Sequence, residues 1–368
     1  MIINGDCLIE LEKLPKNSID AIITDPPYEL NFMNKGWDHA RISFQTDTWK
    51  KCFDVLKPGG HLLAFGGTRT YHRIACAIED AGFEIRDCIM WLYGSGFPKS
   101  MNLGLAIDKK NGVESKVVGN GKSGTSSRTY QSEATTTAGN YEIKEAQNEW
   151  KGWGTALKPS YEPIIVARKP FKGSCIDNVI KYGVGGINID ECRVKTNEKI
   201  ETGRNGRNNK TIFQASLTND NEREYQNIGR FPANTVLDTR KGEEWRRYFY
   251  CSKASKKDRD EGLNEFEKDI TDDGRNKPID NPFLRGKTMR YNTHPTVKPT
   301  SLMQYLIRLV APKGAVILDP FMGSGSTGKA IEYENKERNS NYKFIGIEKD
   351  AEYCKIAAAR IKYAKGEK

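Results

Sequence analysis

The chain has 368 residues, of which 37% are hydrophobic, and a formal net charge of +10 at pH 7. A chain of this length and composition buries a sizeable core, in one elaborated domain or in two, and does not resemble a disordered protein. No apolar run is long enough to cross a bilayer, and the first residues lack a basic region followed by an apolar one. We therefore expect a cytoplasmic protein with no membrane partner.

The excess of basic residues favours a polyanionic partner, most simply a nucleic acid. The chain has eight cysteines and four histidines, and no two cysteines form a Cys-x-x-Cys pair. Neither a zinc site nor a disulfide framework is therefore predicted, and we expect no metal.

Segments with the pattern of strands alternate with segments with the pattern of helices. In the first half of the chain the predicted strands are 2–6, 19–23, 61–67, 85–93 and 163–169, and the predicted helices are 8–14, 43–56 and 70–81. Near the end of the chain, helices are predicted at 299–310, 327–333 and 351–363 and strands at 315–319 and 344–348. This alternation predicts an α/β fold with a doubly wound, mostly parallel sheet.

The apolar run 19–23 leads into Asp25-Pro26-Pro27-Tyr28. Two prolines continue neither a strand nor a helix, so the chain must leave the sheet in a rigid extended turn. Ligands bind at the carboxyl ends of strands in open α/β sheets. There the turn offers a carboxylate, the Pro26 carbonyl and an aromatic ring, which together fit a planar base that carries an amino group. The alternative is a proline-rich turn whose aspartate only caps it.

A glycine-rich segment, 319–329, lies between a predicted strand and a predicted helix, where a ligand can approach backbone amides. Gly323, Gly325 and Gly328 satisfy the dinucleotide fingerprint, and Glu348 lies at a suitable distance along the chain to hold ribose hydroxyls. Asp319 would repel a pyrophosphate, but it suits the ammonium and sulfonium groups of S-adenosylmethionine.

The same segment has two other interpretations. With Lys329 it matches a phosphate-binding loop, although Ala330 occupies the place of the hydroxyl that binds Mg²⁺. It also matches a glycine-rich turn that only packs a helix on a sheet.

Periodicity weakens between 170 and 290, where glycine, asparagine and basic residues dominate. We interpret this part as a separate, irregular insertion that forms either a nucleic-acid surface or a solvated face. Two loops, 29–42 and 111–150, are predicted to be mobile, and the first is either a lid or an exposed connection. The residues expected to contact DNA are Lys35, Trp37, Arg204, Arg207, Lys253, Lys256 and Lys257.

Three motifs together closely resemble the β group of DNA amino-methyltransferases. Asp25-Pro-Pro-Tyr28 comes first, His294-Pro-Thr-x-Lys-Pro299 follows, and Asp319-Pro-Phe-x-Gly-Ser-Gly-Ser-Thr327 comes last. The match covers about 2–101 and 292–361, and the segments at 32–38, 94–100 and 158–163 are similar to a phage- and mobile-element-associated branch. Tyr161 departs from the histidine common in relatives.

The resemblance implies a Rossmann-like class I methyltransferase domain built from 1–169 and 292–368, with a target-recognition region at 170–291. It implies catalytic roles for Asp25, Pro26, Pro27 and Tyr28. Glu348 would bind the ribose, Asp6 would lie near the adenine ring, and Thr296 and Lys298 would meet the methionine end. The remaining expected cofactor residues are Asp319, Phe321, Gly323, Ser324, Gly325, Ser326 and Thr327.

The implied activity is site-specific transfer of a methyl group from S-adenosylmethionine to the N6 amino group of a flipped adenine in duplex DNA. Aspartate at the first motif position is commoner with adenine in this family, and cytosine N4 is the alternative. Cytosine-C5 chemistry is not indicated, because no cysteine follows a proline. More distant alternatives are an NAD-dependent oxidoreductase and a non-catalytic nucleic-acid-binding protein. A homodimer and a cognate restriction endonuclease of a restriction-modification system stay open.

Overall fold

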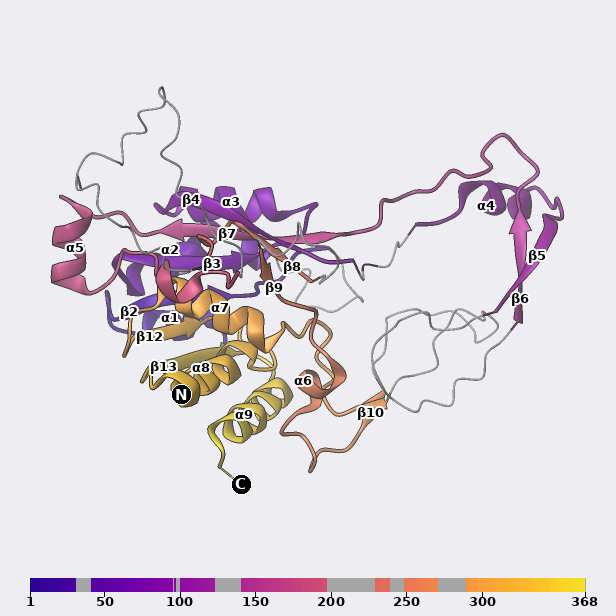
Figure 1. Ribbon diagram of the computed structural model, residues 1–368. Helices are drawn as coiled ribbons and strands as arrows, with labels where there is room; N and C mark the ends of the chain where they lie inside the picture. The colour runs from indigo at the N-terminus through magenta and orange to yellow at the C-terminus, as the bar shows by residue number, and fades with distance from the viewer. Residues whose placement is uncertain are drawn as a thin grey trace, which may run out of the picture. The chain divides into compact units, whose positions relative to one another are not determined.

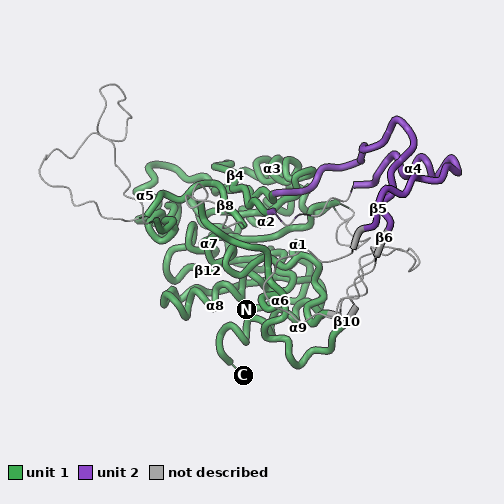
Figure 2. The backbone as a smooth tube through the Cα atoms, turned by 45° about the vertical axis from the view of Figure 1, so that its right-hand side comes forward, with its two compact units in different colours: residues 1–93, 161–269, 290–368 green, residues 94–160, 270–289 purple. Residues whose placement is uncertain are grey.

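The computed structural model describes residues 1–30, 41–94, 96, 100–122, 140–196, 229–238, 248–270 and 289–367. The chain divides into two compact units (Figure 2). The first comprises 1–93, 161–269 and 290–368, and the second comprises 94–160 and 270–289.

The first unit is built on a sheet whose described strands run in the order β1-β13-β12-β2-β3-β7-β4-β8-β9 (Figure 1). Every neighbouring pair is parallel except those of β7, which runs antiparallel to both β3 and β4. The predicted α/β fold with a mostly parallel sheet is therefore confirmed. The strands are β1 (Ile2–Asn4), β2 (Ile19–Thr24), β3 (Leu56–Phe65), β4 (Glu84–Leu92), β7 (Tyr161–Arg168), β8 (Thr235–Leu237), β9 (Phe249–Tyr250), β12 (Val316–Asp319) and β13 (Lys343–Glu348).

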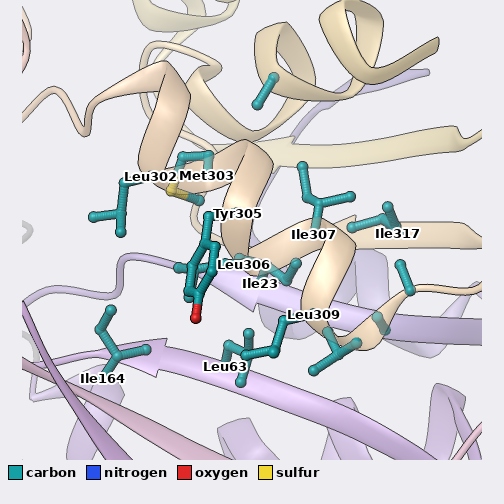
Figure 3. Packing of buried hydrophobic residues seen from close by; sticks show 14 of the residues in the cluster. Ile23, Leu63, Ile164, Leu302, Met303, Tyr305, Leu306, Ile307, Leu309 and Ile317 are labelled. Carbon is teal, nitrogen blue, oxygen red and sulfur yellow. The ribbon is translucent and has the colours of Figure 1, made fainter. Parts of the chain in front are cut away.

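Helices cover both faces of this sheet, as alternation along the strands requires. Leu62 contributes to the core cluster under α1 (Cys7–Glu12), α2 (Thr46–Val55) and α3 (Tyr71–Asp80). The next residue, Leu63, contributes to the opposite cluster, under α7 (Thr300–Val310), α8 (Ser326–Arg338) and α9 (Ala351–Lys365). Figure 3 shows Leu63 of this second cluster below Leu306 and Leu309. None of the described helices is both long and apolar enough to cross a membrane.

The region 170–291 is not wholly irregular, which corrects the expectation from its weak periodicity. It contains α5 (Cys175–Tyr182), the short η4 (Asp190–Cys192) and α6 (Lys256–Asp260), and its strands β8 and β9 extend the central sheet beyond β4. Val236 and Cys251 lie in the core, and the Trp91 indole donates a hydrogen bond of 2.9 Å to the Cys251 carbonyl. These strands are too short to produce a recognisable apolar period in the sequence.

The second unit contains α4 (Leu103–Lys110) and a two-stranded antiparallel sheet of β5 (Lys116–Lys122) and β6 (Asn140–Glu145). The prediction of a loop over 111–150 is therefore wrong for these strands, where Val117, Val118 and Ile143 supply β-branched side chains. Residues 31–40 of the other predicted loop lie outside the described residues, and the short η3 (Ile42–Phe44) follows them. A further pair of short strands, β10 (Asp269–Ile270) and β11 (Met289–Arg290), completes the fold.

Two parts of the chain that are far apart in sequence meet where β12 pairs with β2. The register places Ile317 opposite Ala21 and Leu318 opposite Ile22, so both strands end at one edge of the sheet. There the Thr24 hydroxyl donates to Oδ1 of Asp319 at 2.7 Å, and the Thr327 hydroxyl donates to Oδ2 at 2.6 Å. Burial raises the pKa of Asp319 to about 6, although these hydrogen bonds favour its charged form. The two ends of the chain therefore meet at one edge of the sheet.

The raised pKa of Asp319 predicts a pH dependence of stability. Because the native carboxyl binds its proton more tightly than the unfolded one, with a pKa of about 6 against 3.8, the unfolding free energy should fall as the pH rises between about 4 and 6. We expect the stability of the wild type relative to Asp319→Asn to fall by about 1.4 kcal/mol per pH unit in this window. Above a pH of about 7 the difference should be constant.

Denaturant unfolding of both proteins between pH 4.5 and 7.5 measures this difference. Asp47→Asn serves as the control, because the Asp47 carboxylate is 66% exposed. A difference between wild type and Asp319→Asn that stays constant across the whole range would contradict the prediction.

Candidate active site

The Asp25 motif follows β2 directly, and hydrogen bonds from neighbouring elements fix its backbone. The Ser43 hydroxyl donates to the Pro27 carbonyl at 2.7 Å, and the Thr70 hydroxyl donates to the Tyr28 carbonyl at 2.8 Å. None of the described residues donates a hydrogen bond to the Pro26 carbonyl. The turn thus offers the Asp25 carboxylate and the Pro26 carbonyl as hydrogen-bond acceptors. The hydrogen bonds from Ser43 and Thr70 hold its backbone in place.

The Asp25 carboxylate is part of a cluster of four polar side chains, which also contains Tyr28, Glu162 and Lys298. The Lys298 ammonium lies 2.5 Å from Oδ2 of Asp25 and 3.5 Å from Oε2 of Glu162. The Tyr28 hydroxyl is 2.8 Å from Oδ1 of Asp25 and 3.2 Å from the same Oε2 of Glu162. One ammonium and one hydroxyl therefore share two carboxylates, and we refer to these residues as the acidic cluster.

Burial sets the protonation of the acidic cluster. It raises the pKa of Asp25, against the attraction of Lys298, and it raises the pKa of Tyr28 together with the two neighbouring carboxylates. Burial opposes the charge of Lys298, but the attraction of Asp25 and Glu162 outweighs it and raises the pKa of the ammonium. Lys298 is therefore a permanent cation at neutral pH.

Tyr93 and Lys253 lie near Glu162. Burial raises the pKa of the Tyr93 hydroxyl, with a smaller contribution from the charge of Glu162, and the Lys253 ammonium lies 3.5 Å from the centre of the Tyr93 ring. Burial lowers the pKa of Lys253, against the attraction of Glu162. A residue predicted to contact DNA thus lies beside the acidic cluster.

The glycine loop, residues 320–325, joins β12 to α8. Gly323 and Gly325 have φ values of +52° and +75°, which strain residues that carry a Cβ atom. The Gly323 amide donates to Oε2 of Glu348 at 2.8 Å, and the Asp350 amide donates to Oε1 at 2.8 Å. Burial raises the pKa of Glu348. This carboxylate, at the carboxyl end of β13, is therefore held against the loop.

Other predicted cofactor residues surround the same edge of the sheet. Asp6 follows β1, caps α1 through the Leu8 amide, and lies 3.2 Å from the Lys349 ammonium. The Phe321 ring packs against Trp49, with ring centres 6.3 Å apart. Thr296 is exposed, and its amide donates to Nδ1 of His294.

The cationic side chains of Arg360 and Lys329 are buried behind the glycine loop and are held there by other groups of the protein. Arg360, fully buried, donates to the Ser324 carbonyl at 2.5 Å and lies 3.5 Å from the Ser326 hydroxyl. Lys329, also fully buried, pairs with Asp258 at 2.9 Å and with Glu261 at 3.0 Å. Because Lys329 is held by these carboxylates, it lies in the wrong place to meet a phosphate, which weighs against the phosphate-binding loop.

The predicted DNA-contacting residues are only partly described. Lys256 and Lys257 are exposed in α6, and Lys253 lies over Tyr93. The other four, Lys35, Trp37, Arg204 and Arg207, lie outside the described residues.

Glu162 was not predicted as a site residue, although its position carried a signal. It is a charged side chain near the start of a strand whose middle, Pro163 to Ala167, is apolar. Because β7 is antiparallel to its neighbours, its amino end lies at the edge where the parallel strands have their carboxyl ends. The sequence pattern does not reveal the direction of β7, and without that direction Glu162 cannot be placed at the site.

Comparison with known protein families matches residues 19–359 to the family described as DNA methylase. The chain is 23% identical to the type II methyltransferase M.HindIII of Haemophilus influenzae, over 98% of this chain and 94% of that protein. It is 24% identical to the DNA adenine methyltransferase YhdJ of Escherichia coli, over 99% of this chain and 83% of that protein.

Solved structures with a similar course of the chain include the M1.HpyAVI complex with SAM, at 17% identity, a TM-score of 0.43 and 98% coverage of both chains. The cytosine-N4-specific PvuII DNA methyltransferase has 14% identity and a TM-score of 0.48, and covers 98% of this chain and 85% of its own. The family match spans most of the chain and includes all three motifs described above. The protein therefore belongs to the DNA methylase family and is an S-adenosylmethionine-dependent DNA methyltransferase of the N6/N4 type.

Proposed function

We propose that this enzyme methylates the N6 amino group of adenine at a specific sequence in duplex DNA, with Asp25, Pro26 and Tyr28 as the groups that hold the target base. The observation that carries the proposal is the proximity of two acceptors, the Asp25 carboxylate and the Pro26 carbonyl, to the glycine loop across the β2–β12 pair. An amino group paired inside a duplex is out of reach, so the base must be flipped out at a cost of a few kcal/mol.

The two acceptors make the amino nitrogen of the base a better nucleophile. The lone pair of an exocyclic amine is delocalised into the ring, which makes the nitrogen a poor nucleophile. Hydrogen bonds from its two N–H groups to Asp25 and to the Pro26 carbonyl favour a tetrahedral nitrogen and localise that pair. The Tyr28 ring stacks on the base. The nitrogen would gain the methyl carbon as the carbon–sulfur bond breaks, with the electron pair of that bond left on the now neutral sulfur. It would then lose one proton, and Asp25 is the adjacent base that would accept it.

The cofactor, S-adenosylmethionine, supplies an electrophilic methyl group on a sulfonium. The residues at the loop fit such a ligand, because Asp6 and Glu348 bring carboxylates to this edge while Lys329 and Arg360 lie buried behind the loop. We propose that Glu348 and Asp6 hold the adenosine end. Phe321, Gly323 and the residues 324–327 shape the pocket. Thr296 and Lys298, the latter a member of the acidic cluster, lie at the border of this pocket.

Asp319 has a different part in this proposal. Both of its carboxylate oxygens accept hydrogen bonds from hydroxyl groups of the protein. Asp319 is also buried, whereas Glu348 is partly exposed, so Asp319 acts on the cofactor mainly by fixing the glycine loop to the end of β2.

Two features favour adenine over the alternative, cytosine N4. The first motif position is aspartate rather than serine, and the relative YhdJ is named a DNA adenine methyltransferase. The order of the motifs along the chain supports membership of the β group, and the segments at 32–38 and 94–100 support the phage-associated branch. We assign target recognition to 170–291, whose described lysines include Lys253, Lys256 and Lys257.

Substitution of Asp25 tests the catalytic assignment. Asp25→Asn should reduce methylation by about 10²–10³-fold, because the amide cannot accept a proton or localise the amine lone pair as well. Modification-sensitive sequencing of DNA from cells that express the wild type or the variant measures both the methylated base and its sequence context. N4-methylcytosine in the wild-type sample would establish the alternative, and unchanged methylation by Asp25→Asn would refute the catalytic assignment.

Substitution of Gly323 tests the cofactor assignment. Gly323→Ala should weaken binding of S-adenosylmethionine about 5- to 100-fold, because φ is +52° and the new Cβ would lie 2.7 Å from the His294 ring. Isothermal titration calorimetry measures the affinity.

Gly183→Ala is the matched control for this test. Gly183 also has a positive φ, +72°, but lies beyond the end of α5 with open space around it. Equal losses of affinity in the two variants would show that general destabilisation, and not the loop, is responsible.

A further inference from the structure

Both oxygens of Asp25 are already occupied in the structure. Oδ1 accepts the Tyr28 hydroxyl at 2.8 Å, and Oδ2 accepts the Lys298 ammonium at 2.5 Å. Each carboxylate oxygen can accept a second hydrogen bond, but the donor that already holds it competes with the target amino group, and the charged Lys298 ammonium competes most strongly. If Asp25 holds that amino group, as proposed above, its bonds to both hydrogens of the amine are strongest when one of these donors moves away.

A displaced donor needs another acceptor at once, because it is buried. Lys298 is only 6% exposed, and an unpaired ammonium in such a place is strongly unfavourable. One oxygen of Glu162, Oε2, lies 3.5 Å from the Lys298 ammonium and 3.2 Å from the Tyr28 hydroxyl. Each donor thus has a near acceptor on Asp25 and a second, slightly farther acceptor on Glu162.

We propose that Glu162 is a positioning residue that takes over Lys298 and Tyr28 when the target amino group binds to Asp25. The transfer requires movements of the order of 1 Å, because both donors already lie close to Oε2. Glu162 keeps Lys298 paired while Asp25 is free to accept hydrogen bonds from the base. The inference rests on the proposed function, since it assumes that Asp25 accepts those hydrogen bonds.

Glu162 also affects the charge of Asp25. The groups that face Asp25 are Lys298, Glu162 of β7, Tyr28 and, across the sheet edge, Asp319 of β12, and the charge of Glu162 also acts on Tyr93 and Lys253. The negative charge of Glu162 raises the pKa of Asp25, in addition to the larger effect of burial. Removal of this charge should lower the pKa of Asp25, so that Asp25 stays ionised at lower pH.

The main test compares Glu162→Gln with the wild type in single-turnover methylation of a duplex that carries the sequence found by the sequencing experiment. We expect the rate to fall about 10- to 100-fold, because Lys298 loses its second charged acceptor and stays on Asp25. The acidic limb of the pH–rate profile should move to lower pH, which a purely structural defect would not cause. Affinity for S-adenosylmethionine should stay within about threefold of the wild-type value, since the variant leaves the glycine loop intact.

A second variant keeps the charge but changes the distance. Glu162→Asp withdraws the carboxylate from both donors, so the rate should fall while the acidic limb stays near its wild-type position. Glu334→Gln is the matched control, because Glu334 is another buried carboxylate, 3.5 Å from Arg308 and 3.7 Å from Arg338 of α8. It should change neither the rate nor the pH profile.

The outcomes separate this inference from the proposed function. A Glu162→Gln rate within twofold of the wild type, or a reduced rate with an unmoved acidic limb, overturns the inference. If Glu162→Gln does not fold, Glu162→Asp decides, and a wild-type rate in that variant overturns it. The proposed function fails instead if Asp25→Asn is fully active, whatever Glu162→Gln shows.

Discussion

The short parallel pairing of β12 with β2 is the constraint on which the site depends. It brings together Thr24 and Asp319, which lie 295 positions apart and share a buried hydrogen bond of 2.7 Å. Parallel strands present their carboxyl ends at the same edge, so one register fixes the Asp25 turn and the glycine loop together. A slip of β12 by one residue would turn Leu318 away from the core cluster that it shares with Ile22, and the hydrophobic effect therefore holds the register.

The distribution of charge in the molecule separates two tasks. The chain as a whole is basic, with a net charge of +10, which favours contact with a polyanion. The edge of the sheet is locally acidic instead, because Asp6, Asp25, Glu162 and Glu348 all lie there. The cations nearest to the loop are bound to protein groups, as Lys329 is to Asp258 and Glu261. A cationic donor thus finds a complementary charge at this edge, whereas the excess of basic residues, which favours a polyanion, belongs to the rest of the chain.

Much of the fold could be predicted from the sequence, because long apolar periods and turn residues determine it. The strands at 19–23 and 315–319 and the helices at 70–81 and 299–310 agree with β2, β12, α3 and α7 to within a residue or two at each end. Strands of two or three residues, such as β8 and β9, leave no period to detect, and their place in the sheet comes from tertiary contacts of residues such as Val236.

The candidate site was predictable only where its residues form local motifs. Asp25, Tyr28 and the glycine loop are each recognisable within a few residues. The contact of Lys298 with Asp25 joins residues 273 positions apart, and Glu162 reaches the cluster because of the direction of β7. Such relations are properties of topology, and no spacing along the chain encodes them.

The antiparallel course of β7 has a further consequence for how such enzymes diversify. Leu92 at the end of β4 pairs with Tyr161 at the start of β7, so the 68 residues from 93 to 160 leave the sheet and return to it at adjacent points. A segment attached in this way can grow, shrink or be exchanged with little entropic penalty, since closure costs rise only slowly with loop length. Evolution therefore has an insertion point one residue away from Glu162, where new sequence can be added while the chemical machinery keeps its geometry.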